Sequence, residues 1–201
     1  MRHIDFEHDP EELEQAAVLE NEKKPGRGVR NLYEWVDALV TSLITVIILF
    51  TFIFRVVSVS GPSMIPTLYS EDRVVLWSYF YQPKQGDVVV ITHTAKLTEP
   101  IIKRIIAVEG QEIDIDFNSG TVYVDGQALD ESAYIQNGIT TQPSDFTFPM
   151  EIPEGKVFVM GDNRAVSNDS RSADVGLIDK RYILGKAEFI VFPFDRIGKI
   201  N

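Results

Sequence analysis

A serine in a rigid turn is the first feature of this sequence that could carry out chemistry. Ser63 follows Gly61 and Pro62, which force a non-regular backbone and leave a serine exposed for attack. Such turns are common, so the local pattern alone does not identify a nucleophile. A serine also requires a neighbouring base that removes its proton, because an unactivated hydroxyl is a weak nucleophile.

Histidine and lysine are the residue types that could serve as this base. His93 ends a predicted strand and precedes polar residues, which is typical of a solvated histidine. Alternation places Lys103 on the same face as Ile101 and Ile105, whereas Arg104 points to the other face. Burial lowers a lysine pKa from about 10.4 by 3–5 units and leaves a neutral, proton-accepting amine. A lysine at a sheet edge that extends to solvent fits the pattern equally well.

A third segment is polar and follows the apolar residues Val157 to Met160. It reads GDNRAVSNDSR over residues 161–171, and Asp, Asn and Ser side chains in such a turn can hydrogen-bond the loop backbone. A purely structural turn is therefore one interpretation. Asp169 and Arg171 can also form an ion pair that braces a nearby site.

The composition excludes several other classes of protein. The 201 residues include no cysteine and only three histidines, so neither thiolate chemistry nor a multi-histidine metal site is expected. The formal net charge of −11 argues against a nucleic-acid-binding protein, which would carry a basic surface. We therefore expect no metal, no other cofactor and no nucleic-acid partner.

An uncharged apolar run of 17 residues, Ala38–Phe54, precedes the serine turn. As a helix with its apolar flanks it spans about 26–30 Å, the thickness of a bilayer core. Four basic residues precede the run and two follow it closely: Lys23, Lys24, Arg27, Arg30, Arg55 and Arg73. The positive-inside rule then predicts a cytoplasmic N-terminus and an extracytoplasmic C-terminal part. The run is too long for a cleavable signal peptide, so we expect an uncleaved anchor.

We expect three parts in the chain. They are an acidic tail with a basic linker at residues 1–34, a transmembrane anchor helix at 35–57 and an extracytoplasmic catalytic domain at 58–201. Asp9 and Pro10 are typical of a helix start, but so short a helix is marginal in water, and we expect a mostly solvated tail.

The C-terminal part is predicted to be mainly β. Short runs rich in β-branched and aromatic residues alternate there with turn signals. These runs are Val74–Leu76, Asp87–Ile91, Ile101–Val108, Glu112–Phe117, Thr121–Val124, Lys156–Met160 and Ala187–Phe192. The pair Asp125-Gly126, which follows one of them, is a strong signal for a tight hairpin.

Four ordered motifs make the chain resemble type I signal peptidases, the leader peptidase family that uses a Ser–Lys dyad. The motifs are SGPSMIPTL from Ser60, GDVVVI from Gly86, IKRIIAVEG from Ile102 and GDNRAVSNDSR from Gly161. With the anchor, the resemblance covers about residues 30–195 and is to the short, single-span form typical of Gram-positive bacteria. It implies a coiled antiparallel β-sheet catalytic domain, with the accessory region reduced to residues 109–155.

The resemblance also implies roles for individual residues. Ser63 would attack the scissile carbonyl, Lys103 would take its proton, and the Ser63 backbone N–H would donate to the oxyanion. Ser167 would hydrogen-bond the lysine, and Asp169 and Arg171 would form the bracing ion pair. No metal or cofactor takes part in this chemistry.

Two positions depart from the family pattern. Gly61 stands where Gram-negative members have a serine that donates to the oxyanion, and loss of such a donor typically costs about 10²–10³ in rate. We expect Ser60 or a water molecule to replace it. Ala165 stands where many members have an acidic residue, and we expect this change to be tolerated. Met64 and Pro66 are expected to shape the nucleophile turn.

Substrates and partners follow from the resemblance and from the position of the serine, eight residues after Arg55. The reaction would occur at the outer membrane surface, close to the secretion translocon, on preproteins that carry signal peptides. Small residues at −1 and −3 would be recognised by β-strand addition between two flanking strands, which the resemblance places at Val56–Gly61 and Pro100–Ile102. The expected substrate-binding residues are Val59, Ser60, Gly61, Ile101 and Ile102. The aromatic run from Trp77 to Tyr81 fits either an interfacial belt or ordinary sheet packing.

Two other functions compete with this hypothesis of a membrane-bound serine endopeptidase in the bacterial cell membrane. A self-cleaving Ser–Lys regulator of the repressor type needs an upstream DNA-binding helix-turn-helix, where this chain has the apolar run. A membrane-anchored binding or scaffold protein would share the fold without the reaction. Labelling by a serine-directed acylating inhibitor separates that protein from an enzyme.

Overall fold

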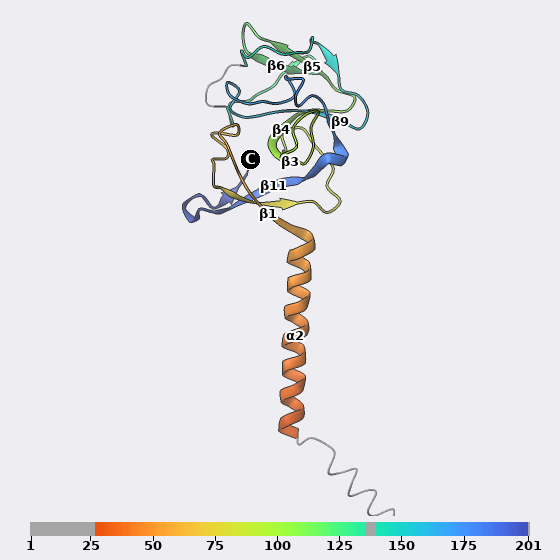
Figure 1. Cartoon of the computed structure of the whole chain (residues 1–201), viewed down its shortest axis with the longest axis vertical. Coiled ribbons are helices and arrows are strands. Elements are labelled where there is room, and N and C mark those ends of the chain that lie inside the picture. The colour runs from red at the N-terminus through yellow and green to blue at the C-terminus, as the bar shows by residue number, and fades with distance from the viewer. Residues whose placement is uncertain (1–26, 136–139, 201) are drawn as a thin grey trace, which may run out of the picture. The chain divides into compact units, whose positions relative to one another are not determined.

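The computed structural model describes residues 27–135 and 140–200 (Figure 1). The chain divides into two compact units, Met1–Leu49 and Phe50–Asn201. The described part of the first unit belongs to one helix, α2 (Arg27–Ile53). The helix start predicted at residues 9 and 10 lies outside the described residues.

The helix α2 covers residues 35–53 of the predicted anchor, 35–57, and has different ends. It begins at Arg27, inside the predicted linker, because no proline follows Pro25 there and a single glycine is tolerated in a helix. It ends at Ile53 and not at Val57, since the β-branched residues that follow join strand β1 (Phe54–Ser58) and pair with β2. Among the described residues, one helix is long and apolar enough to cross a membrane, over Gly28–Ile48.

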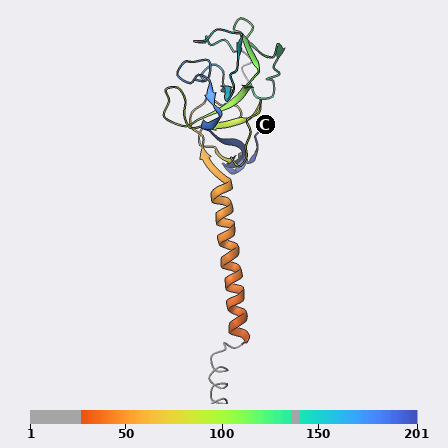
Figure 2. The ribbon, with the colours of Figure 1, turned by 90° about the vertical axis from the view of Figure 1, so that its right-hand side faces the viewer.

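The second unit is mainly β and its strands pair antiparallel. Within the described residues, an eight-stranded sheet has the order β1-β2-β11-β3-β4-β9-β10, with β12 paired to β11, and a four-stranded sheet has the order β7-β6-β5-β8. Figure 2 shows that the strands curl around one another instead of lying flat. The remaining bounds are β2 (Arg73–Trp77), β3 (Val88–Ile91), β4 (Ile101–Val108), β5 (Glu112–Asp116), β6 (Thr121–Val124), β7 (Gln127–Ala128), β8 (Met150–Glu151), β9 (Lys156–Met160), β10 (Ile178–Asp179), β11 (Ile183–Phe192), β12 (Gly198–Lys199), η1 (Lys180–Tyr182) and η2 (Phe194–Arg196).

The prediction of a mainly β domain is confirmed, and each predicted strand is present. Strand β11 begins at Ile183, four residues before the predicted start at Ala187. Asp125 and Gly126 have φ angles of 52° and 74° and join β6 to β7, as the hairpin signal predicted. The strands that the sequence did not reveal have only two residues each: β8, β10 and β12. Strand β1 overlaps the flanking strand that the resemblance implies at Val56–Gly61.

Two groups of buried side chains matter for the site. The first lies beneath the loop between β1 and β2 and joins it to the large sheet; it includes Val59, Met64, Leu68, Val74, Leu76, Val88, Val90 and Ala187. The second joins the two sheets and includes Ile106, Phe158 and Met160 from the large sheet and Ile113, Ile115, Val122 and Val124 from the small one. The small sheet therefore packs on β9 and on β4, the strand that carries Lys103.

Candidate active site

Ser63 lies in the loop of residues 59–72, which connects β1 to β2. The two ends of the loop are joined by a backbone hydrogen bond from Val59 N to Asp72 O at 2.8 Å. Gly61 has a φ of 84°, a left-handed conformation that a side chain would strain. The hydrogen bond between the two ends of the loop and the backbone conformation of Gly61 together determine the position of Ser63.

Two apolar side chains hold the same loop from below. Met64 and Leu68 are 1% and 0% exposed and pack against residues of β2 and β11. Burial of such a side chain contributes about 1.5–3 kcal/mol, so the core fixes the turn that presents Ser63. Pro66, joined to Ile65 by a cis peptide bond, lies between these two anchors.

The amine of Lys103, on β4, lies within hydrogen-bond distance of the serine hydroxyl. Lys103 Nζ is 2.8 Å from Ser63 Oγ and donates a second hydrogen bond to Ile102 O at 3.1 Å. The Lys103 residue is only 4% exposed. The interpretation of Lys103 as an edge lysine that extends into solvent is therefore wrong.

The surroundings of Lys103 favour its neutral form. Loss of water around the amine lowers the pKa of Lys103 from 10.5 to about 8, while the carboxylates of Asp169 and Asp162 act in the opposite direction. With a pKa of about 8, about one tenth of the amines are neutral at pH 7, far more than for an exposed lysine. A neutral amine at this distance can accept the proton of the serine hydroxyl.

A buried ion pair connects three segments around the dyad. Arg104 Nε and Nη2 each lie 2.8 Å from an Asp162 oxygen, and Arg104 and Asp162 are both 2% exposed. Thr67 Oγ1 donates to the same carboxylate. One carboxylate therefore ties together β4, the nucleophile loop and the turn after β9.

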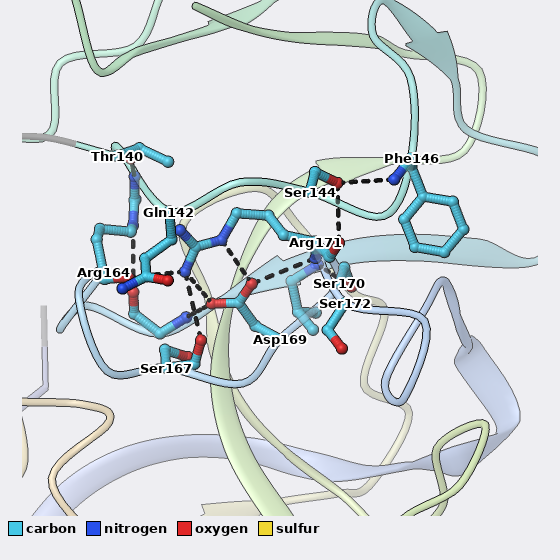
Figure 3. A network of polar contacts seen from close by, with 12 residues as sticks. Thr140, Gln142, Ser144, Phe146, Arg164, Ser167, Asp169, Ser170, Arg171 and Ser172 are labelled. Atoms are coloured by element: carbon cyan, nitrogen blue, oxygen red, sulfur yellow. Dashed lines mark hydrogen bonds and ion pairs between the residues drawn. The ribbon is translucent and has the colours of Figure 1, made fainter. Parts of the chain in front are cut away.

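Asp169 and Arg171 form the expected ion pair (Figure 3). Arg171 Nε and Nη2 lie 2.8 and 2.9 Å from the two Asp169 oxygens. Asp169 also accepts from Gly161 N at 3.0 Å, and Arg171 donates to Arg164 O at 2.9 Å. The pair thus closes the turn of residues 161–171 through its backbone.

Ser167 does not form the hydrogen bond to Lys103 that the sequence analysis expected. Its buried Oγ has no hydrogen-bond partner within the described parts of the chain. A Cβ added at Gly161 would lie 2.3 Å from Ser167 Oγ and 2.5 Å from Ser63 O. The hydroxyl therefore packs against the open side of Gly161 instead of the amine.

Asn163 is a site residue that the sequence analysis missed. Its backbone N–H donates to Ser63 O at 2.9 Å, and its Nδ2 donates to Pro62 O at 3.2 Å. The turn after β9 therefore holds the nucleophile by its own backbone. The sequence feature that could have indicated this role is the position of Asn163 next to Asp162 in the polar turn.

A cleft of about 550 Å³ opens beside the dyad and has Ser63 and Lys103 in its wall. Three of the five expected substrate-binding residues line it: Ser60, Ile101 and Ile102. The other two, Val59 and Gly61, do not. Val59 is 4% exposed because its side chain is part of the core beneath the loop.

The remaining candidate base lies elsewhere. His93 is exposed, and its ring lies against Thr92 Oγ1, 3.2 Å from Nδ1, and beside the ring of Tyr182. A serine hydroxyl, a buried amine and an adjoining cleft are the groups that a hydrolase with a serine nucleophile and a lysine base requires.

Comparisons with known proteins identify the family. A family model described as signal peptidase, peptidase S26, matches residues 32–192. Signal peptidase I of Bacillus licheniformis is 34% identical over 189 residues, which cover 90% of this chain and 99% of that protein. Signal peptidase IB of Staphylococcus aureus is 33% identical over 182 residues, which cover 82% of this chain and 92% of that protein.

A crystal structure of a signal peptidase I from Enterococcus faecalis matches at 27% identity with a TM-score of 0.43, over 53% of this chain and 97% of that one. On the match to the family model and to the curated relatives, the chain belongs to the S26 family of signal peptidases and is a hydrolase.

Proposed function

We propose that this chain is a membrane-bound serine endopeptidase that cleaves N-terminal signal peptides from exported preproteins. The observation that carries the proposal is the 2.8 Å distance between the buried amine of Lys103 and the hydroxyl of Ser63, beside an open cleft. Relatives that match nearly the whole chain are named signal peptidases, which supports this class of substrate.

The reaction has two steps. Neutral Lys103 accepts the Ser63 proton while Oγ attacks the scissile carbonyl carbon, and the tetrahedral oxyanion accepts from the Ser63 backbone N–H and the Ser60 hydroxyl. Protonated Lys103 returns its proton to the leaving amine as the peptide bond breaks. Lys103 then deprotonates a water molecule, whose oxygen attacks the acyl carbon, and returns this proton to Ser63 Oγ as the acyl–Oγ bond breaks and the signal peptide is released.

The substrate binds as an extended strand in the cleft. Segments on the two sides of the cleft, Val57–Ser58 and Pro100–Ile102, offer backbone groups to it, and Ile101 and Ile102 shape shallow pockets for small side chains. Asp169 and Arg171 brace the turn that holds the nucleophile.

We further propose that α2 anchors the enzyme in the bacterial cell membrane, with the N-terminus in the cytoplasm and the β domain outside. The four basic residues at residues 23–30, just before and within the first turn of the helix, support this orientation. Tyr79 and Phe80 are 57% and 87% exposed, which supports an interfacial role for these two residues, whereas Trp77 belongs to β2 and Tyr81 packs against the core. The substrate then reaches the site as it leaves the translocon.

The test is cleavage of a preprotein with an Ala-x-Ala site by the full-length protein in lipid vesicles. We expect Ser63→Ala and Lys103→Ala to lower turnover by more than about 10³-fold while both variants still insert into the vesicles. The matched controls are Ser119→Ala and Lys199→Ala, which change exposed residues of the same types. Near-normal turnover by Lys103→Ala would rule out the dyad.

A further inference from the structure

A third buried arginine, Arg164, lies in the turn after β9 among the described residues. It is 3% exposed, and its Nε donates to Gly161 O at 3.1 Å. Its chain neighbour Asn163 is the residue whose N–H donates to Ser63 O. The conformation of Arg164 is therefore coupled through a short stretch of backbone to the nucleophile.

The carboxylate that balances Arg164 comes from a distant part of the chain. Arg104 and Arg171 pair with aspartates of the turn itself, whereas Arg164 pairs with Glu131, which follows β7. Arg164 Nη1 lies 2.9 Å from Glu131 Oε2, and the Glu131 side chain is 12% exposed. Arg164 Nη1 also donates to Thr140 Oγ1 at 2.7 Å (Figure 3).

The segment that contains Glu131 also contacts Arg104, the arginine next to Lys103. The ring of Tyr134 lies over the guanidinium of Arg104, with Cζ 4.0 Å from the ring centroid, in a cation–π contact. Tyr134 Oη donates to Glu131 Oε1 at 3.2 Å, and Tyr134 N donates to Glu131 O at 3.1 Å. We name residues 131–134 the clasp, since one turn holds two buried guanidinium groups.

We propose that the clasp positions the catalytic pair: Glu131 and Tyr134 hold Arg164 and Arg104, which fix the backbone around Ser63 and Lys103. The inference rests on the proposed function and deepens it. A buried guanidinium that loses its carboxylate turns toward solvent or draws water inward. Such a movement displaces the turn that binds Ser63, and a displacement of about 1 Å can lower a rate about 100-fold.

The test compares two substitutions of glutamate by glutamine in the full-length protein. Glu131→Gln keeps the side-chain size and removes the charge, whereas Glu154→Gln makes the same change at an exposed position. A serine-directed acylating inhibitor, allowed to react to completion, counts the active molecules. We expect Glu131→Gln to lower kcat per active molecule about tenfold with KM within twofold of wild type, and Glu154→Gln to change neither.

A merely structural role gives a different result. It would lower the number of labelled molecules and leave kcat per labelled molecule unchanged, and this result would overturn the proposal. A second pair of variants avoids dependence on the folding of Glu131→Gln. Tyr134→Phe keeps the ring over Arg104, and we expect it to keep kcat within twofold, whereas Tyr134→Leu loses at least threefold.

The outcomes separate the clasp from the proposed function. If the wild-type protein cleaves the substrate and both Glu131→Gln and Tyr134→Leu keep full kcat per active molecule, the positioning role of the clasp is ruled out and the proposed function stands. If the wild-type protein does not cleave the substrate, the proposed function is ruled out, and the role of the clasp is ruled out with it.

Discussion

The reactivity of Lys103 depends on how two nearby carboxylates are balanced. Asp169 and Asp162 both raise the pKa of the Lys103 amine and so oppose the effect of burial. Each carboxylate, however, is engaged by a buried arginine at 2.8–2.9 Å. Two negative charges can therefore brace the site while the amine remains able to lose its proton.

This balance determines the pH dependence of the reaction. The pKa of Lys103 is lowered to about 8, so the amine is protonated and inactive as a base below that pH and neutral above it. We expect kcat/KM to rise with pH, with a slope of one and a midpoint of about 8. A peptide substrate without titratable groups, assayed from acid to alkaline pH, gives the profile.

A histidine base would give a similar ascending limb, so the control removes that explanation. His93 is the sole histidine in the part of the chain that the structure describes. We expect His93→Gln to leave the midpoint unchanged. A midpoint above 10, where an exposed lysine titrates, would contradict the buried neutral amine.

Gly161 provides a steric test of the same site. A methyl group at Gly161 would lie 2.5 Å from Ser63 O and 2.3 Å from Ser167 Oγ, far inside contact distance. We expect Gly161→Ala to displace Ser63 and to lower kcat by about 100-fold, measured in the cleavage assay. The control is Gly198→Ala, whose methyl group would have its nearest neighbour at 3.9 Å and should leave kcat unchanged.

The local pattern left the roles of Ser63 and Lys103 open, and the resemblance to type I signal peptidases singled them out as the proposed dyad. The structure places the two side chains 2.8 Å apart, but the sequence did not reveal their complete surroundings. The link of Asn163 to Ser63 and the pairing of Arg164 with Glu131 depend on contacts between segments distant in the sequence. Neither residue spacing nor composition encodes such contacts.

At the level of elements, the predicted strands were reliable where alternation and turn chemistry agreed. The hairpin between β6 and β7 is an example, because Asp125 and Gly126 both tolerate positive φ. The predicted end of the anchor helix at Val57 was wrong, because Val56 and Val57 are apolar and fit a membrane helix and a strand equally well. Pairing with β2, which the sequence pattern does not encode, decides in favour of the strand.

Two ion pairs with the same spacing allow a test of how the turn after β9 is held. Arg171 pairs with Asp169 and is 3% exposed, whereas Arg181 pairs with Asp179 and is 81% exposed. Loss of one partner from a buried pair typically costs about 3–5 kcal/mol, and an exposed pair contributes little. We expect Arg171→Ala to lower the denaturation midpoint of the full-length protein strongly and Arg181→Ala to leave it unchanged. Equal effects would contradict a bracing role for the buried pair.

Charge is unevenly distributed over the whole molecule. Residues 109–155 contain ten acidic residues and no lysine or arginine, whereas residues 23–30 contain four basic residues and no acidic ones. Only lysine and arginine close to a membrane helix determine its orientation, and acidic residues contribute little. The net charge of −11 therefore does not predict topology, but the basic cluster at the start of α2 does.

A topology experiment can separate these two effects of charge. Replacing Lys23, Lys24, Arg27 and Arg30 by glutamine removes the cluster, and we expect a fraction of the chains to insert with the β domain inside. Replacing four acids of the tail, Glu11, Glu12, Glu14 and Glu20, by glutamine changes the net charge by the same amount in the opposite direction and should leave the orientation unchanged. Protease added outside intact cells digests an external β domain and spares an internal one, so the protected fraction measures orientation directly. A β domain protected in the wild-type protein would contradict the proposed topology, because the enzyme would then face away from translocated substrates.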